Sequence, residues 1–293
     1  MAQEDERAER AALGEKMTVR ARDGPGLQGA AFSRKCARMS GIEILALLAS
    51  AAAAGAVNAI AGGGTLLTFP TLLLMGTPPV VANATSTLAL VIGTAGSIFG
   101  YRRQVAAVRP WLRSFVPVSL AGGLLGSALL THSSPEVFAR LVPFLILFAT
   151  VLFLSQGAFR RLAKAGSAPA EAGRGLWVAV AFQFAVAVYG GYFGAGIGIL
   201  MLASLGFLGL GDIHEMNALK NILGSLINLV AATWFVASGL IDWPKAAIMT
   251  VGALAGYFAG AHFSQRIPQQ RVRVLITVIG FGMSAATFWK QFG

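Results

Sequence analysis

The sequence predicts an all-α, polytopic helical membrane protein with about eight full spans arranged in two pseudo-symmetric repeats. Of its 293 residues, 56% are hydrophobic and only 12% are charged, and the mean hydropathy is +0.69. A soluble domain carries about 25% charged residues. Several apolar stretches reach the roughly 20 residues that a helix needs to cross a bilayer core of about 30 Å. Two glycine-rich breaks also interrupt apolar stretches at matching places in the two halves.

The chain divides into a polar tail and a membrane region. Residues 1–40 are rich in Arg, Glu and Ala, so we expect a disordered cytoplasmic tail. The membrane region is predicted to contain a first repeat at 41–155, a cytoplasmic linker at 156–175 and a second repeat at 176–293. The clearest predicted spans are Gly41–Ala61, Val80–Tyr101, Trp111–Leu130, Val137–Ser155, Asn217–Ser238 and Pro244–His262.

The glycine-rich breaks follow the first apolar stretch of each half. The first break contains Gly62-Gly63-Gly64, and the second runs from Gly190 to Gly198. We expect the short pieces after them, Thr65–Met75 and Ile197–Leu210, to be re-entrant or broken helices that do not cross the membrane. Unpaired backbone is tolerated in a membrane only where it is buried in protein or lines a cavity. A matched pair of such segments indicates the central site of a secondary transporter.

The repeat and the basic residues together predict the topology. Asn83-Ala84 and Asn217-Ala218 lie 134 residues apart, which indicates an internal duplication. Basic clusters precede the first span, follow the Val80–Tyr101 span and fill the linker, so the positive-inside tendency places all three in the cytoplasm. This requires an even number of spans between them, and therefore halves in the same orientation with both termini inside. An alternative with ten spans and inverted halves would place the linker outside.

Other features of the sequence argue against several classes of function. The basic residues lie at span ends, which argues against nucleic acid as a partner. The single cysteine, Cys36, offers no disulfide or cysteine-based metal site. Nucleotide-binding and hydrolase motifs are missing from the sequence, so we expect no cofactor, no metal and no enzymatic activity. Gly252, Gly256 and Gly260 share one helix face, which favours close packing inside the chain, with a homodimer as the alternative.

Lys220 is the sharpest candidate for contact with a substrate. It lies within a predicted span and shares a helix face with Asn217 and Asn221. A cation at the bilayer centre costs about 2.5–3.5 kcal/mol, so Lys220 should face a cavity or a partner. One interpretation is a fixed positive charge for an anion. The other is a lysine at the interface that pairs with Asp212 or Glu215.

The first half contributes a neutral polar patch, and both halves contribute glycine backbone. Asn83, Thr85 and Ser86 either cap a helix or place donors where an anion docks. The glycines of the breaks leave N–H groups uncovered that can bind an oxyanion. The predicted substrate-binding residues are Gly62, Gly63, Gly64, Asn83, Thr85, Ser86, Gly194, Gly196, Asn217, Lys220 and Asn221.

These motifs resemble those of the TauE/SafE family of sulfite and organosulfonate exporters. The resemblance covers about residues 41–290. It implies a secondary transporter that moves small sulfur-containing anions, such as sulfite, sulfoacetate or a related organosulfonate, across the bacterial inner membrane by alternating access. A ten-span inverted-repeat metabolite carrier and a passive anion channel are the alternatives. The strings that carry the resemblance are Asn58-Ala59-Ile60-Ala61-Gly62-Gly63-Gly64-Thr65, Phe69-Pro70, Ala82-Asn83-Ala84-Thr85-Ser86, Gly194-Ala195-Gly196-Ile197-Gly198, Asn217-Ala218-Leu219-Lys220-Asn221 and Gly239-Leu240-Ile241-Asp242-Trp243.

Overall fold

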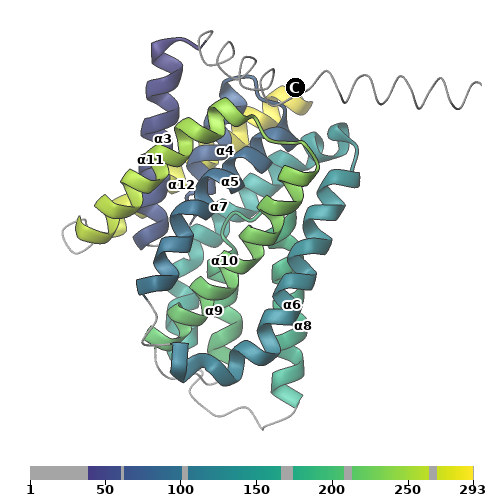
Figure 1. Ribbon diagram of the computed structural model, residues 1–293, viewed down its shortest axis with the longest axis vertical. Helices are drawn as coiled ribbons and strands as arrows, with labels where there is room; N and C mark the ends of the chain where they lie inside the picture. The colour runs from purple at the N-terminus through teal and green to yellow at the C-terminus, as the bar shows by residue number, and fades with distance from the viewer. Residues whose placement is uncertain are drawn as a thin grey trace, which may run out of the picture. The chain divides into compact units, whose positions relative to one another are not determined.

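A computed structural model describes residues 39–60, 63–100, 105–165, 174–207, 213–263 and 269–292, and these residues form helices and the turns between them. Most of the predicted tail, Gly62 and the middle of the predicted linker lie outside the described residues. The helices are α3 (Gly41–Ile60), α4 (Thr65–Leu74), α5 (Pro79–Gly100), α6 (Val105–His132), α7 (Pro135–Ala165), α8 (Arg174–Tyr192), α9 (Ile197–Phe207), α10 (Ile213–Ala237), α11 (Trp243–Phe263) and α12 (Gln269–Phe292) (Figure 1).

The all-helical prediction is confirmed, and each predicted span coincides with one helix to within a residue or lies inside a longer one. Helix α7 continues to Ala165 and α8 begins at Arg174, so both ends of the predicted linker are helical. In the described part of the chain, the stretches long and apolar enough to cross a membrane are Gly41–Ala59, Val108–His132, Pro135–Ser155 and Glu215–Ala237. Thr65–Leu74, Pro79–Thr94 and Leu176–Tyr192 are apolar but shorter, so the number of full spans stays a prediction.

Residues 1–44 and 45–293 form two separate units. The described part of the first unit contains the start of α3, where Ser40 and Glu43 form a reciprocal capping box. The Ser40 N–H donates to Glu43 Oε2 at 2.8 Å, and the Glu43 N–H donates to Ser40 Oγ at 3.2 Å. These bonds satisfy N–H groups that a helix start otherwise leaves unpaired.

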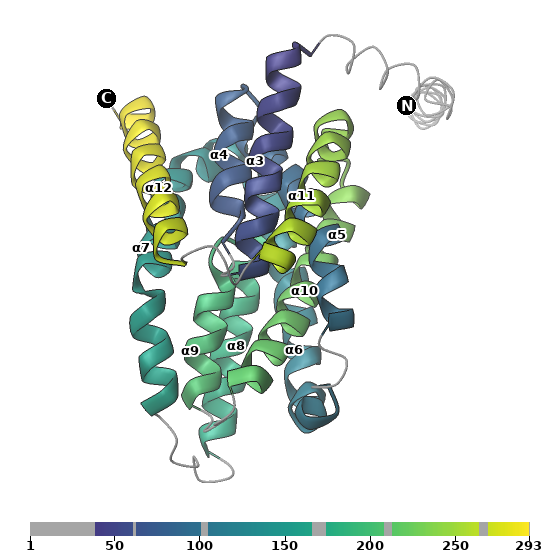
Figure 2. The ribbon, with the colours of Figure 1, turned by 90° about the vertical axis from the view of Figure 1, so that its left-hand side faces the viewer.

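The second unit is built around two broken helices. The chain turns back after α3 into α4 and after α8 into α9, so each break joins a long helix to a short one beside it (Figure 2). Helices α4 and α9 contain 10 and 11 residues. At 1.5 Å per residue they span about 15–17 Å, roughly half of a bilayer core. The expected short pieces after both glycine breaks are therefore confirmed as short helices.

Small residues allow α3 and α11 to pack closely. A methyl group added at Gly252 would meet Leu48 of α3, and one added at Gly260 would meet Ala56. Residue numbers rise together along both helices, so α3 and α11 run parallel. The prediction that these glycines serve packing inside the chain is confirmed, since their faces are covered by α3.

Helices at corresponding positions of the two halves run in opposite directions, which corrects the expectation of halves in the same orientation. Helix α6 runs parallel to α8, because Gly122 approaches Ala187 and Gly126 approaches Val188. It also runs parallel to α10, and the turn after α10 reverses the chain into α11 (Figure 2). Helix α11 is therefore antiparallel to α6, and α3, which is parallel to α11, is antiparallel to α8. The direction of each helix follows from how the helices pack, and the distribution of basic loops contains no information about that packing.

Candidate functional site

The two glycine breaks meet at one cavity of about 490 Å³ in the second unit. Gly63 and Thr65 line it from the first break, and residues 193, 194 and 196–198 line it from the second. The edge-to-face contact between the Phe69 and Phe193 rings, with centroids 5.2 Å apart, holds α4 against the second break. Segments more than a hundred residues apart in the sequence thus enclose a common space, in the range of about 300–1,000 Å³ that takes small organic molecules.

Glycine is required in the breaks by the backbone itself. Gly63, Gly194 and Gly196 have φ values of +96°, +80° and +80°, in the left-handed region that other residues rarely adopt. The second break is held from within, because the Tyr189 hydroxyl donates to the Ala195 carbonyl at 2.8 Å. The breaks are therefore fixed turns that present main chain to the cavity.

Both short helices begin at this cavity. Thr65, the first residue of α4, and Ile197 and Gly198, the first residues of α9, line its wall. The Asn58 side chain fixes the start of α4, because its Oδ1 accepts the Gly64 N–H at 2.7 Å. A helix start carries a partial positive charge and N–H groups without helical partners, so two helix starts directed at one cavity favour an anion there.

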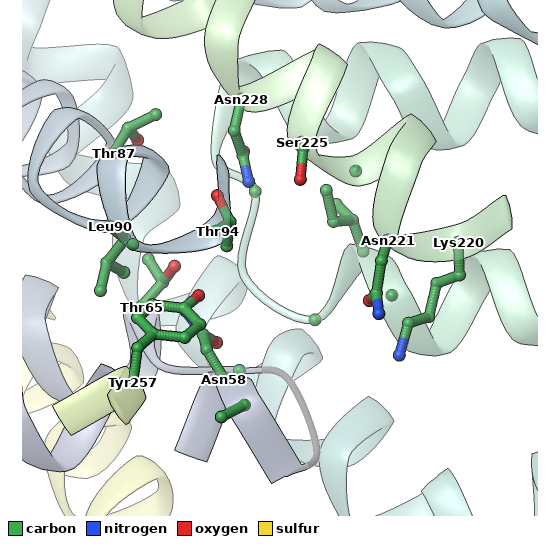
Figure 3. A pocket seen from close by; sticks show the side chains of 18 of the residues that line it. Asn58, Thr65, Thr87, Leu90, Thr94, Lys220, Asn221, Ser225, Asn228 and Tyr257 are labelled. Carbon is green, nitrogen blue, oxygen red and sulfur yellow. The ribbon is translucent and has the colours of Figure 1, made fainter. Parts of the chain in front are cut away.

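Lys220 brings a full charge to the same place. Its aliphatic stem crosses the first turn of α9, where a methyl group on Gly198 would lie 3.4 Å from Lys220 Cδ. Its Nζ donates to Asn217 Oδ1 at 3.4 Å. Lys220 and Asn221 line the cavity, and Lys220 alone has a formal charge among the lining residues that the structure describes (Figure 3). Asp212, one of the two pairing partners considered, lies outside the described residues.

The predicted polar patch of the first half lies elsewhere. Asn83, Thr85 and Ser86 are buried, and the cavity lining does not include them. Helix α5 begins at Pro79, so all three lie inside the helix rather than at its cap. They bind other elements: Asn83 Nδ2 donates to the Tyr192 carbonyl at 3.1 Å, Thr85 Oγ1 accepts the Asp242 N–H at 3.0 Å, and Ser86 Oγ lies 2.6 Å from Thr68 Oγ1. These contacts position α5 relative to α4, the end of α8 and the start of α11.

The remaining predicted residues that the structure describes either line the cavity or lie just behind its lining. Gly63, Gly194, Gly196, Lys220 and Asn221 line the cavity. Gly64 and Asn217 lie one contact behind it: Gly64 is buried under Asn58, and Asn217 holds Lys220.

Several lining residues were missing from the predicted set. Ser225 and Asn228 lie one and two turns beyond Asn221 on the same face of α10, a spacing that the sequence displays. Asn58, from the end of α3, belongs to the first glycine motif. Thr94 of α5 and Tyr257 of α11 reach the cavity only through the packing of their helices, and no signal in the sequence marks them.

Alanine at Gly196 should destabilise the fold through backbone strain alone. The space for a methyl group is open there, since the first atom it would meet is 3.7 Å away, but φ is +80°. A left-handed conformation costs a residue with a side chain about 1–2 kcal/mol. We expect Gly196→Ala to lower the thermal unfolding temperature in detergent. Gly198→Ala, two residues away in a helical conformation, is the matched control and should leave it nearly unchanged.

Fold and site together define the class of protein. A helical membrane protein in which two broken helices direct their starts at one polar cavity fits the class of membrane transporters. The chain is 29% identical over 260 residues to the "probable membrane transporter protein" of Haemophilus influenzae, covering 86% of this chain and 97% of the relative. It is 26% identical over 243 residues to the "probable membrane transporter protein YfcA" of Escherichia coli K12, covering 82% of this chain and 87% of the relative.

A more distant relative and a family profile agree with this class. The chain is 24% identical over 241 residues to the "probable membrane transporter protein ORF9" of a Sinorhizobium species, covering 81% of this chain and 89% of the relative. No solved structure matches the chain at a significant level. The profile of the family described as sulfite exporter TauE/SafE matches residues 47–287. This chain therefore belongs to the TauE/SafE family of membrane transporters.

Proposed function

We propose that this protein is a secondary transporter that moves small sulfur-containing anions, such as sulfite, sulfoacetate or a related organosulfonate, across the bacterial inner membrane. The anion binds in the cavity between the two breaks. The observation that carries the proposal is the convergence of two helix starts and Lys220 on one space of about 490 Å³. All three favour negative charge, and no Asp or Glu is among the described residues that line the cavity.

Neutral donors complete the proposed site. Asn221, Ser225 and Asn228 follow one another along α10 and direct amide and hydroxyl groups at the cavity (Figure 3). An oxyanion with three oxygens accepts several hydrogen bonds at once, and such bonds are stronger than those between neutral partners. The main chain of Gly196 and Gly198 adds donors without side-chain bulk, whereas the Gly194 N–H already donates to the Tyr189 carbonyl at 3.1 Å.

Access to the site alternates by movement of one half against the other around it. The opposite directions of α3 and α8, and of α6 and α11, support inverted repeats, with α4 and α9 as pieces that enter without crossing. In such carriers the site lies where the repeats meet, near the membrane midplane, and rocking of the repeats opens it to each side in turn.

Transport by reconstituted protein tests the proposed function. Purified protein in liposomes should take up labelled sulfite or a small sulfonate in a saturable manner. Unlabelled anion loaded inside should accelerate this uptake, because a carrier exchanges its substrate and a channel does not. Uptake of sulfonates no faster than by protein-free liposomes would reject the proposal, and flux that never saturates would favour the channel.

Cysteine labelling tests the inverted arrangement. We expect Ser134→Cys, after α6, and Ser238→Cys, after α10, to react with an impermeant maleimide from the same side, because α6 and α10 run parallel. Both positions are exposed. Halves in the same orientation would place them on opposite sides. The native Cys36 is replaced by serine in both variants.

The same labelling decides the side of the C-terminus. Helix α12 runs antiparallel to α7, since Gly280 approaches Thr150 and Ser284 Oγ donates to the Pro143 carbonyl at 3.1 Å. The end of α12 therefore lies with Ser134. Labelling of Ser134→Cys only from the inside would support the expected cytoplasmic termini. Labelling from outside would instead assign the cytoplasm to the opposite end, where Arg109 and Arg113 are exposed.

A further inference from the structure

The cavity has a second polar end, on the wall away from Lys220. There α3, α5 and α11 contribute Asn58, Thr94 and Tyr257, while Lys220 and Asn221 lie across the cavity on α10 (Figure 3). These three side chains are polar but uncharged, and the apolar Leu90 lies beside them (Figure 3). A bare four-atom oxyanion bound at Lys220 would leave this end of a 490 Å³ cavity without a guest.

Tyr257 is built firmly into the second end. Its ring lies so close to Gly93 of α5 that any side chain at that position would collide with it. Its main chain lies against Gly55 of α3, where a methyl group would come within 2.9 Å of the Tyr257 nitrogen. The residue lines the cavity and is only 9% exposed. Contacts from two neighbouring helices therefore fix the phenol, and with it the direction of its hydroxyl beside the cavity (Figure 3).

The hydroxyl at this position is a donor without an acceptor. Asn58 neighbours it, but no group in the described part of the chain meets hydrogen-bond geometry with the Tyr257 oxygen. The Asn58 Oδ1 accepts the Gly64 N–H, which fixes the side chain, and its NH2 group is a further donor at this end of the cavity. Buried polar groups find partners in most proteins, so an unpaired phenol at a cavity wall points to a partner that arrives with the guest. That partner must accept hydrogen bonds.

We propose that the transported anion is a two-ended organic molecule, with its anionic group at Lys220 and an uncharged hydrogen-bond acceptor, such as a hydroxyl, at Tyr257. This inference rests on the proposed function and specifies its substrate. The far group is uncharged because the lining residues at that end offer no charge to compensate it. Hydroxyalkyl sulfonates fit this description. Alkyl sulfonates lack the acceptor, and an ammonium group carries only donors.

Two sulfonates that differ by one hydroxyl test the inference. Proteoliposomes are assayed for uptake of 2-hydroxyethanesulfonate and of ethanesulfonate. We expect wild-type protein to prefer the hydroxylated anion by on the order of tenfold in apparent affinity, as for one well-placed hydrogen bond to a buried donor. Tyr257→Phe should reduce this preference to about one. Tyr192→Phe, outside the cavity lining, is the matched control and should keep the preference.

The possible results distinguish the proposed contact at Tyr257 from the proposed transport of anions. Equal uptake of both sulfonates by wild-type protein would reject the proposed hydrogen bond at Tyr257 but would remain compatible with the proposed anion site at Lys220. A preference that survives in Tyr257→Phe, or that is lost equally in Tyr192→Phe, would also overturn it. Uptake of neither sulfonate would reject the proposed function and this inference with it.

Discussion

Replacement of Lys220 by glutamine is expected to abolish anion uptake. Glutamine keeps a polar side chain that can donate hydrogen bonds but removes the positive charge, which no other described residue of the lining supplies. Loss of one partner from a desolvated charge pair costs about 2–5 kcal/mol, which corresponds to a loss of roughly 30-fold to several thousandfold in affinity. The measurement is saturable uptake of a labelled sulfonate into proteoliposomes, with the amount of reconstituted protein determined for each variant.

Lys290→Gln is the matched control for this experiment. Lys290 is exposed near the end of α12 and does not line the cavity, so the same loss of charge should leave uptake unchanged. If Lys220→Gln transports as well as wild type, the positive charge of Lys220 plays no part in anion binding. The interpretation of Lys220 as a lysine paired at the membrane interface would then stand in its place.

Alanine at Gly256 is expected to destabilise the folded protein by about 3 kcal/mol, near the upper end of the usual cost of overpacking. A methyl group there would collide with the Ala52 carbonyl of α3. The colliding atom belongs to a helix backbone and cannot turn away as a side chain would, so α3 and α11 must separate. We expect a clear fall in the thermal unfolding temperature of the protein in detergent.

Gly282→Ala supplies the comparison on α12. No atom lies within 4 Å of the added methyl group, and alanine favours a helix over glycine. This variant should unfold at or slightly above the wild-type temperature. Equal stability of Gly256→Ala and Gly282→Ala would show that α3 and α11 do not depend on close backbone contact.

Much of the candidate site can be read from local sequence. The breaks need glycine for their backbone conformation, so the sequence alone identifies Gly63, Gly194 and Gly196 as candidates. All three line the cavity. Lys220 and Asn221 were found because a cation and an amide on an apolar helix need a polar surrounding. In each case one residue, or its spacing within one helix, contains the signal.

The predicted residues and the cavity lining differ where a residue's contacts come from distant parts of the sequence. Asn83 and Thr85 have the chemistry of anion-binding residues, yet each forms a hydrogen bond with a residue more than a hundred positions away. Asn83 donates to the Tyr192 carbonyl, and Thr85 accepts the Asp242 N–H. Tyr257 is the opposite case. Nothing in its local sequence distinguishes it from an interfacial tyrosine. Its place in the cavity wall follows from Gly93 and Gly55, which allow α5 and α3 to pack closely against it.

Sequence by itself determined that this chain is helical, enters a membrane, breaks at two glycine motifs and has a lysine within an apolar helix. These properties depend on hydropathy and backbone freedom, which act over a few residues. Only the tertiary structure decided that the breaks share one cavity, that corresponding helices run in opposite directions, and which polar side chains face the cavity. These properties depend on which helix surfaces fit together, and close packing sets that fit between residues far apart in the chain.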